Sequence, residues 1–80
     1  MNPKLVKQAV AYAAGLCEQN NGRIIVLVNG TNSNSEIRPY LGERIRFDVT
    51  QNALIVEYSD GKKFIDINSI NSIHCYKQKI

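Results

Sequence analysis

The stretch from Arg44 to Ile73 constrains the fold most, because apolar and polar residues alternate along three short runs that turn residues separate. Its strongest local signal is the Asp60-Gly61 pair, since both residues tolerate the positive φ of a type I′ hairpin turn. A two-residue loop at this pair would fix the register of the hairpin. The facing pairs would then be Tyr58 with Lys63, Val56 with Ile65, and Leu54 with Ile67.

A third strand precedes this hairpin across the turn at Gln51-Asn52. Loops of two or four residues there give the same register, so the prediction does not depend on the turn type. Arg46 then faces Glu57 as a cross-strand ion pair, worth up to about 1 kcal/mol. The three strands share one apolar inner face, made of Ile45, Phe47, Val49, Leu54, Val56, Tyr58, Ile65 and Ile67.

The N-terminal segment predicts an amphipathic helix over about residues 3–20. Asn2 can cap this helix, and Pro3 suits the first helical position. The helix should end near residues 19–22, where glycine or asparagine can adopt the left-handed conformation. We expect its apolar stripe to cover a sheet rather than a partner helix or a membrane surface. The stripe consists of Leu5, Ala9, Tyr12, Ala13 and Leu16, flanked by Val6, Val10 and Cys17.

The remaining segments complete one domain over residues 1–80. The β-branched run 23–28 predicts a strand buried on both faces, and the polar segment 31–36 predicts a flexible loop. Pro39 limits residues 37–41 to an edge strand. The fold class is therefore α+β and mostly β, with the helix followed by a bent antiparallel meander or a small barrel of four to five strands. The strands are expected at about 23–28, 37–41, 44–49, 54–58, 63–67 and 70–76.

Composition sets further bounds. A chain of 80 residues buries only a small core, which makes a homo-oligomer a natural supplement. The net charge of +3 permits an anionic partner without indicating one. Cys17 and Cys75 do not form a disulfide framework, so we expect reduced, half-buried thiols in a cytoplasmic protein. The apolar run 9–17 is too short to span a bilayer, which predicts no membrane partner.

The sequence carries few groups for catalysis or metal binding. His74 is the only histidine, and on a strand its neighbour Cys75 would point to the opposite face. Phosphate-loop, dinucleotide and nucleophile-elbow motifs are absent. Asp48, Glu57 and Asp66 can share the outer face of the meander, but arginines beside them would stabilise the ionised carboxylates, which is wrong for a general acid. We predict no enzymatic activity, no cofactor and no metal.

The sequence does combine cations with aromatic rings, the mixture that binds single-stranded nucleic acid or nucleotides by charge and stacking. The alternative is that the rings pack in the core and the cations only solubilise the surface. A second combination is the Lys62-Lys63 turn with Tyr76 and Lys77. The candidate binding residues are Arg38, Tyr40, Arg44, Arg46, Lys62, Lys63 and Phe64.

Three short motifs carry a family resemblance. Val28-Asn29-Gly30 ends the first strand, Gly42 precedes Phe47-Asp48, and Ile70 to Ile73 occupies the place of a closing strand. In these motifs and in its order of elements the chain resembles the Sm-like fold, and more specifically the bacterial Hfq branch of RNA-binding proteins. The resemblance implies a small Sm/SH3-like barrel, a ring-shaped homo-oligomer and binding of single-stranded RNA. It carries over only Phe47 and Asp48, which shape the barrel in that family.

Three functions follow as hypotheses. The first is a non-enzymatic, Sm-like oligomer that binds single-stranded RNA, and its affinity should fall steeply with salt. The second is a small oligomer that sequesters or senses an anionic small ligand such as a nucleotide. The third is a protein-binding adaptor or inhibitor that uses the helix or an exposed sheet edge.

Overall fold

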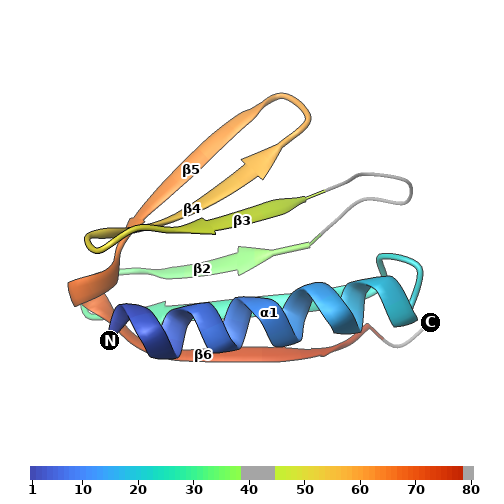
Figure 1. Cartoon of the computed structure of the whole chain (residues 1–80), viewed down its shortest axis with the longest axis horizontal. Helices are drawn as coiled ribbons and strands as arrows, with labels where there is room; N and C mark the ends of the chain where they lie inside the picture. Colours follow the sequence, from blue (N-terminus) through green and yellow to red (C-terminus); the bar gives the residue numbers. More distant parts are fainter. Residues whose placement is uncertain (39–44, 79–80) are drawn as a thin grey trace.

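The computed structural model describes residues 1–38 and 45–78. In this part of the chain one helix precedes six antiparallel strands, which form two three-stranded sheets (Figure 1). The predicted class, α+β with mostly strand, is confirmed, and the described strands do not close into a barrel. The elements are α1 (Pro3–Gln19), β1 (Ile24–Gly30), β2 (Asn34–Ile37), β3 (Arg46–Val49), β4 (Ala53–Tyr58), β5 (Gly61–Asp66), the 3₁₀ turn η1 (Ile67–Ser69) and β6 (Ile70–Lys77).

Both ends of α1 form as predicted. The side chain of Asn2 accepts a backbone N–H of the first turn at 2.7 Å, and Pro3 is the first helical residue. After the last turn, Asn21 and Gly22 adopt φ values of 54° and 80°. The N–H of Gly22 donates to the carbonyl of Cys17 at 2.8 Å. This left-handed closure pairs a carbonyl that the helix itself leaves without a partner.

The buried side of α1 differs from the predicted stripe. Val6, Val10 and Ala13 are buried, whereas Leu5 is 51% and Tyr12 is 62% exposed. Of the predicted stripe Ala13 is buried, but its centre is shifted toward the flanking Val6 and Val10. Small and β-branched side chains let the helix lie close to the sheets, so the larger ones are left at the rim.

The first sheet has the order β2-β1-β6, with β1 in the middle. Ile24 and Val26 face the core, and Ile25 is buried on the other side, so the prediction of a strand buried on both faces is confirmed. The loop predicted over 31–36 is wrong in its second half, which forms β2. The pairing of Ile37 with Val26 anchors this strand, and an edge position lets its polar residues face solvent. Residues 39–41 of the predicted edge strand lie outside the described residues.

The second sheet has the order β3-β4-β5, and the register of β3 with β4 is the predicted one. Phe47 pairs with Val56, and Arg46 lies opposite Glu57. The predicted ion pair between Arg46 and Glu57 is wrong, because the Glu57 carboxylate instead lies 3.9 Å from the Nζ of Lys62. Both partners of that pair are exposed, so it adds little stability.

The register of the β4–β5 hairpin differs from the predicted register by two residues. Tyr58 pairs with Gly61, so the loop is Ser59-Asp60, and Val56 faces Lys63 rather than Ile65. Positive φ values in the described residues occur at Asn21 and Gly22 alone, so this turn is not type I′. A shift of two residues keeps every side chain on its predicted face. All eight residues of the predicted inner face accordingly belong to the core or pack against it.

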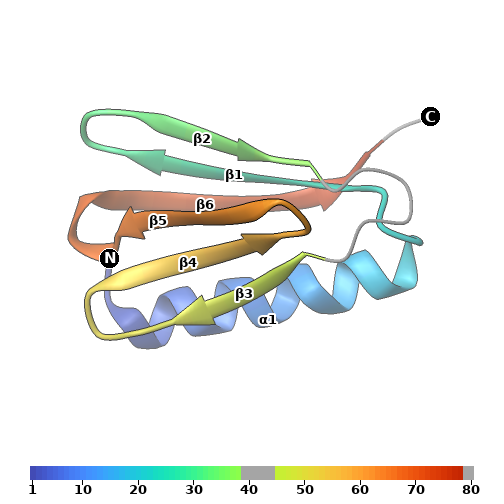
Figure 2. The same ribbon diagram turned by 90° about the horizontal axis from the view of Figure 1, so that it is seen from above.

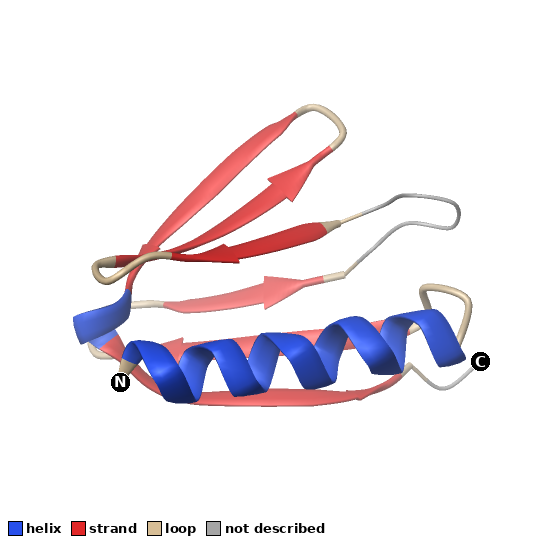
Figure 3. Ribbon diagram, viewed as in Figure 1, coloured by secondary structure: helices blue, strands red, loops and turns tan. Residues whose placement is uncertain are grey.

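The core lies where α1 and the two sheets meet. In Figure 1, α1 runs in front of β1 and β6, with β3, β4 and β5 above; seen from above in Figure 2, it lies beside β3, on the side away from β4. The turn η1 carries the chain from β5 to β6 at one end of the molecule (Figure 3). The amino group of Met1 donates to the carbonyls of Ile67 and Ile70 at 2.8 and 2.9 Å, which ties the start of α1 to η1. The helical segments of the described residues lack the length and apolarity to cross a membrane.

Gly30 lies where three backbone segments approach each other. A Cβ atom at this position would lie 2.7 Å from the carbonyl oxygen of Ser33 and 3.1 Å from that of Ser69. We expect Gly30→Ala to lower the free energy of unfolding by about 1–2 kcal/mol, measured by urea denaturation. The matched control is Gly15→Ala, where a Cβ meets no atom within 4 Å and helix propensity should raise stability by about 0.5–1 kcal/mol. Equal effects of the two changes would contradict this account.

Candidate functional site

The face of the β3-β4-β5 sheet that points away from the core is here called the outer face. Alternation along the strands and the observed register define its residues. One row across the sheet runs Arg46, Glu57, Lys62, and the next runs Asp48, Ile55, Phe64. The outer face consists of Arg46, Asp48, Ala53, Ile55, Glu57, Lys62, Phe64 and Asp66.

Phe64 is the most exposed large apolar side chain of this face. Its side chain is 67% exposed, and its cross-strand partner Ile55 is half-buried. β5 is an edge strand, so among the described strands β4 is its one neighbour in the sheet. An exposed aromatic ring on a sheet offers a flat apolar surface on which a planar ligand can stack.

Charges of both signs surround this ring. Arg46 and Lys62 supply the cations, and Lys62 lies 3.9 Å from the Glu57 carboxylate. The carboxylate of Asp66 accepts the backbone N–H of Asn68 at 3.0 Å, so it is engaged in capping η1. Asp48 lies on β3, two strands away from Phe64. The cations of the outer face therefore flank the ring on the Lys62 side.

The structure brings three of the predicted site residues together and separates two others. Arg46, Lys62 and Phe64 share the outer face. Lys63 is exposed but belongs to the opposite side of β5, where it pairs with Val56. Arg38 follows β2 in the other sheet and its guanidinium lies 2.7 Å from the Glu36 carboxylate. Tyr40 and Arg44 lie outside the described residues.

The second predicted combination is not formed as one surface. Tyr76 and Lys77 lie on β6 of the first sheet, whereas Lys62 and Lys63 lie on β5 of the second. In Figure 1 the β4–β5 turn is at the top of the molecule and β6 is at the bottom.

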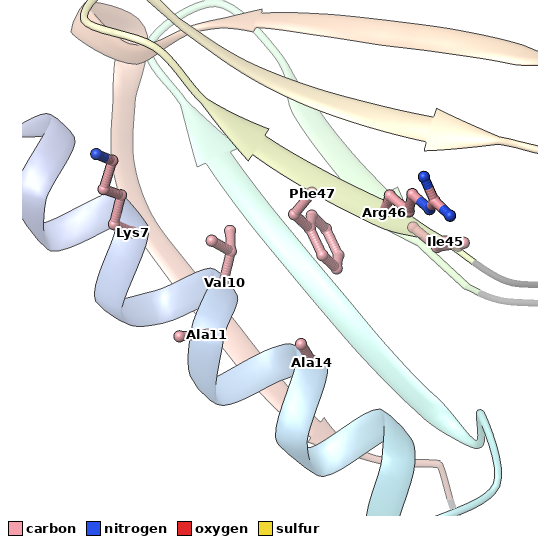
Figure 4. A pocket seen from close by; sticks show the side chains of 7 residues that line it. All are labelled: Lys7, Val10, Ala11, Ala14, Ile45, Arg46 and Phe47. Atoms are coloured by element: carbon pink, nitrogen blue, oxygen red, sulfur yellow. The ribbon is translucent and has the colours of Figure 1, made fainter.

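A groove between α1 and β3 was missed by the sequence reasoning. It has a volume of about 410 Å³, and its charged lining residues in the described part of the chain are Lys7 and Arg46 (Figure 4). The two exposed alanines on one side of α1 are the signal that could have indicated it, because short side chains leave space beside a helix. The lining residues are Lys7, Val10, Ala11, Ala14, Ile45, Arg46 and Phe47.

The described residues hold no cluster of three or more histidine, cysteine or acidic side chains that could bind a metal ion. His74 pairs with Leu27 and Cys75 pairs with Val26, so the two neighbours point to opposite faces of β6, as predicted. Both Cys17 and Cys75 are half-buried free thiols, also as predicted.

The Cys75 thiol gives a prediction on reactivity. Its Sγ lies 3.8 Å from the carbonyl oxygen of Ala9, and burial raises the pKa of this thiol because desolvation disfavours the thiolate. Since the thiolate is the reactive form, iodoacetamide at about pH 8 should alkylate Cys75 more slowly in the folded protein than in urea. The folded pKa is the higher one, so Cys75 contributes stability that is lost as pH rises from about 8.5 through the folded value. Peptide mass spectrometry gives both rates, and equal rates would contradict the prediction.

In comparison with known proteins, the chain matches no family model, no curated protein and no solved structure. The assignment of function therefore depends on the geometry of its own surfaces.

Proposed function

We propose that this chain is a non-enzymatic binding protein that takes single-stranded RNA on the outer face of the β3-β4-β5 sheet. The observation that carries the proposal is the 67% exposed ring of Phe64, which shares this face with Arg46 and Lys62. Aromatic rings on an open sheet stack on nucleobases, and each stacked base is worth about 1–3 kcal/mol.

The charges of the outer face affect both the orientation and the affinity of a bound RNA strand. A nucleobase on Phe64 would place its phosphates toward Lys62 and Arg46, because these are the cations on the neighbouring row. The carboxylates of Asp48 and Glu57 on the same face would repel phosphates and so lower the affinity. We therefore expect one protomer to bind RNA with modest affinity, and stacking on Phe64 to contribute more to that affinity than the charges do.

The proposal includes a homo-oligomer that multiplies these faces. Edge strands β2 and β5 each pair on one side alone among the described strands, and such edges can pair with another copy. Several weak faces on one particle bind a long strand far more tightly than one face does. The solution mass from light scattering tests this part, and a monomer at all concentrations would refute it.

The RNA proposal itself is tested by fluorescence anisotropy with a labelled single-stranded RNA of mixed sequence. The matched probe is the same sequence as a duplex, whose bases are not free to stack on Phe64. We expect the single strand to bind more tightly. With two cations per face, the logarithm of its affinity should fall with the logarithm of salt at a slope of about −1.4 per face. An absence of binding at low salt, or tighter binding of the duplex, would refute the proposal.

Mononucleotides are the third ligand to be tested, because they carry the same base and phosphate groups as single-stranded RNA. A nucleotide at 100 times its dissociation constant should stabilise the protein by about 2.7 kcal/mol in a thermal-shift assay. If nucleotides bind and longer strands gain no affinity, the outer face is a nucleotide site rather than an RNA-binding surface.

A further inference from the structure

The free edge of β3 carries backbone groups that no described strand satisfies. β3 pairs with β4 alone, and the turn between them closes with the N–H of Thr50 donating to the carbonyl of Ala53 at 2.9 Å. Hydrogen-bonded pairs alternate along an antiparallel ladder, so Arg46 and Asp48 direct their N–H and C=O toward β4. Phe47, between them, directs its N–H and C=O to the free edge.

The groove between α1 and β3 lies along this edge. Figure 2 places α1 on the side of β3 away from β4, and Figure 4 shows Phe47 pointing toward the helix. The helical wall is formed by Val10 with Ala11 and Ala14, whose short side chains leave the groove open. An edge strand with a helix beside it is the geometry in which an extended peptide adds a strand to a sheet.

The charges of the groove indicate what kind of peptide fits. Lys7 from α1 and Arg46 from β3 line it, and none of the lining residues that the structure describes is acidic. Figure 4 shows these two cations toward opposite ends, with Phe47 between them. An occupant with apolar side chains at the centre and carboxylates toward its ends would therefore be complementary in both polarity and charge.

We propose that the groove binds an extended, acidic peptide segment of a protein partner as an added strand on β3. Main-chain hydrogen bonds to Phe47 hold the peptide, and alternate side chains enter the groove, because successive side chains on a strand point to opposite sides. β3 has four residues, so about four residues of the peptide can pair with it. The groove shares Arg46 with the outer face but not Phe64, so peptide binding there does not depend on stacking at Phe64.

The test uses a fluorescein-labelled peptide with valines at its centre and glutamates at both ends, and the counterpart with lysines in place of the glutamates is the control peptide. We expect the acidic peptide to bind at least tenfold more tightly, because the charged side chains among the described lining residues, Lys7 and Arg46, are both cations. Lys7→Glu should weaken its binding about tenfold. Lys4→Glu makes the same change in net charge at an exposed position of α1 outside the groove, and should leave binding unchanged. Equal binding of the two peptides, or equal effects of the two substitutions, would overturn the proposal.

Two further measurements distinguish a peptide that pairs with β3 from other ligands in the groove. Amide hydrogen exchange at Phe47 should slow in the complex, and unchanged exchange would show that the peptide does not pair with β3. Ala14→Trp should fill the groove and abolish binding, whereas Gln8→Trp, on the same helix outside the groove, should not. A protein dimer that Ala14→Trp dissociates, or RNA that displaces the peptide even from the Phe64→Ala variant, would assign the groove to another occupant and overturn the proposal.

Discussion

Truncation of Leu54 to alanine should lower the free energy of unfolding by about 2–5 kcal/mol. Leu54 has 0% exposure and is the second residue of β4, the middle strand of its sheet, where it lies between Val49 on β3 and Ile65 on β5. Removing its branched end leaves a cavity that strands on both sides hold open, so the surroundings cannot collapse around it. A domain of this size has a total stability of about 4–12 kcal/mol, so the variant should be largely unfolded or close to its midpoint in mild urea.

The matched control is Leu5→Ala, which removes the same atoms from a side chain that is 51% exposed on α1. We expect a cost below about 1 kcal/mol, because much of this side chain already contacts water. Urea denaturation followed by circular dichroism gives both values. Similar losses for Leu54→Ala and Leu5→Ala would mean that the core is not where the structure has it.

The inner face of the second sheet could be predicted because alternation alone determines it. Phe47, Val49, Leu54 and Val56 follow the period of two, and any register that differs by two residues gives the same face. The register of the β4–β5 hairpin could not be obtained in this way. The Asp60-Gly61 pair favours one turn, and the competing pairing at Tyr58 and Gly61 buries the same apolar residues, so local turn preference did not decide the outcome.

The first sheet and the helix show a different limit. β2 is polar over most of its length, and it is a strand because β1 offers an unpaired edge and Ile37 has a place in the core. No local signal contains that information. On α1, the periodicity predicted the helix and its ends, but Leu5 and Tyr12 lie at the rim because the narrow contact with the sheets selects Val6, Val10 and Ala13.

The candidate sites were predictable in part for the same reasons. The outer face follows from alternation, which groups Arg46 with Glu57 and places Phe64 opposite Ile55. The groove could not be predicted from alternation, because it depends on how α1 and β3 lie relative to each other in space. These two elements are far apart in the sequence, and no local pattern indicates that they are neighbours.

Replacing Phe64 by alanine should reduce the affinity for single-stranded RNA by about 5- to 150-fold, the equivalent of one stacked base at 1–3 kcal/mol. The substitution should reduce RNA affinity without reducing the stability of the fold, since Phe64 is 67% exposed and does not belong to the core. Phe64→Tyr keeps an aromatic plane and should retain binding. Anisotropy titrations of the three proteins at one salt concentration measure the effect, and thermal unfolding checks that each is folded.

The control for this prediction is Tyr12→Ala, which removes another exposed aromatic ring, at 62% exposure, from α1 rather than from the outer face. If stacking on Phe64 carries the binding, Tyr12→Ala leaves the affinity unchanged while Phe64→Ala does not. The cations give an independent check, because Lys62→Ala should reduce the salt slope by about 0.7 and leave the stacking contribution in place. Unchanged affinity in Phe64→Ala, or equal losses in both aromatic variants, would remove the outer face as the RNA-binding surface, whatever the protein binds elsewhere.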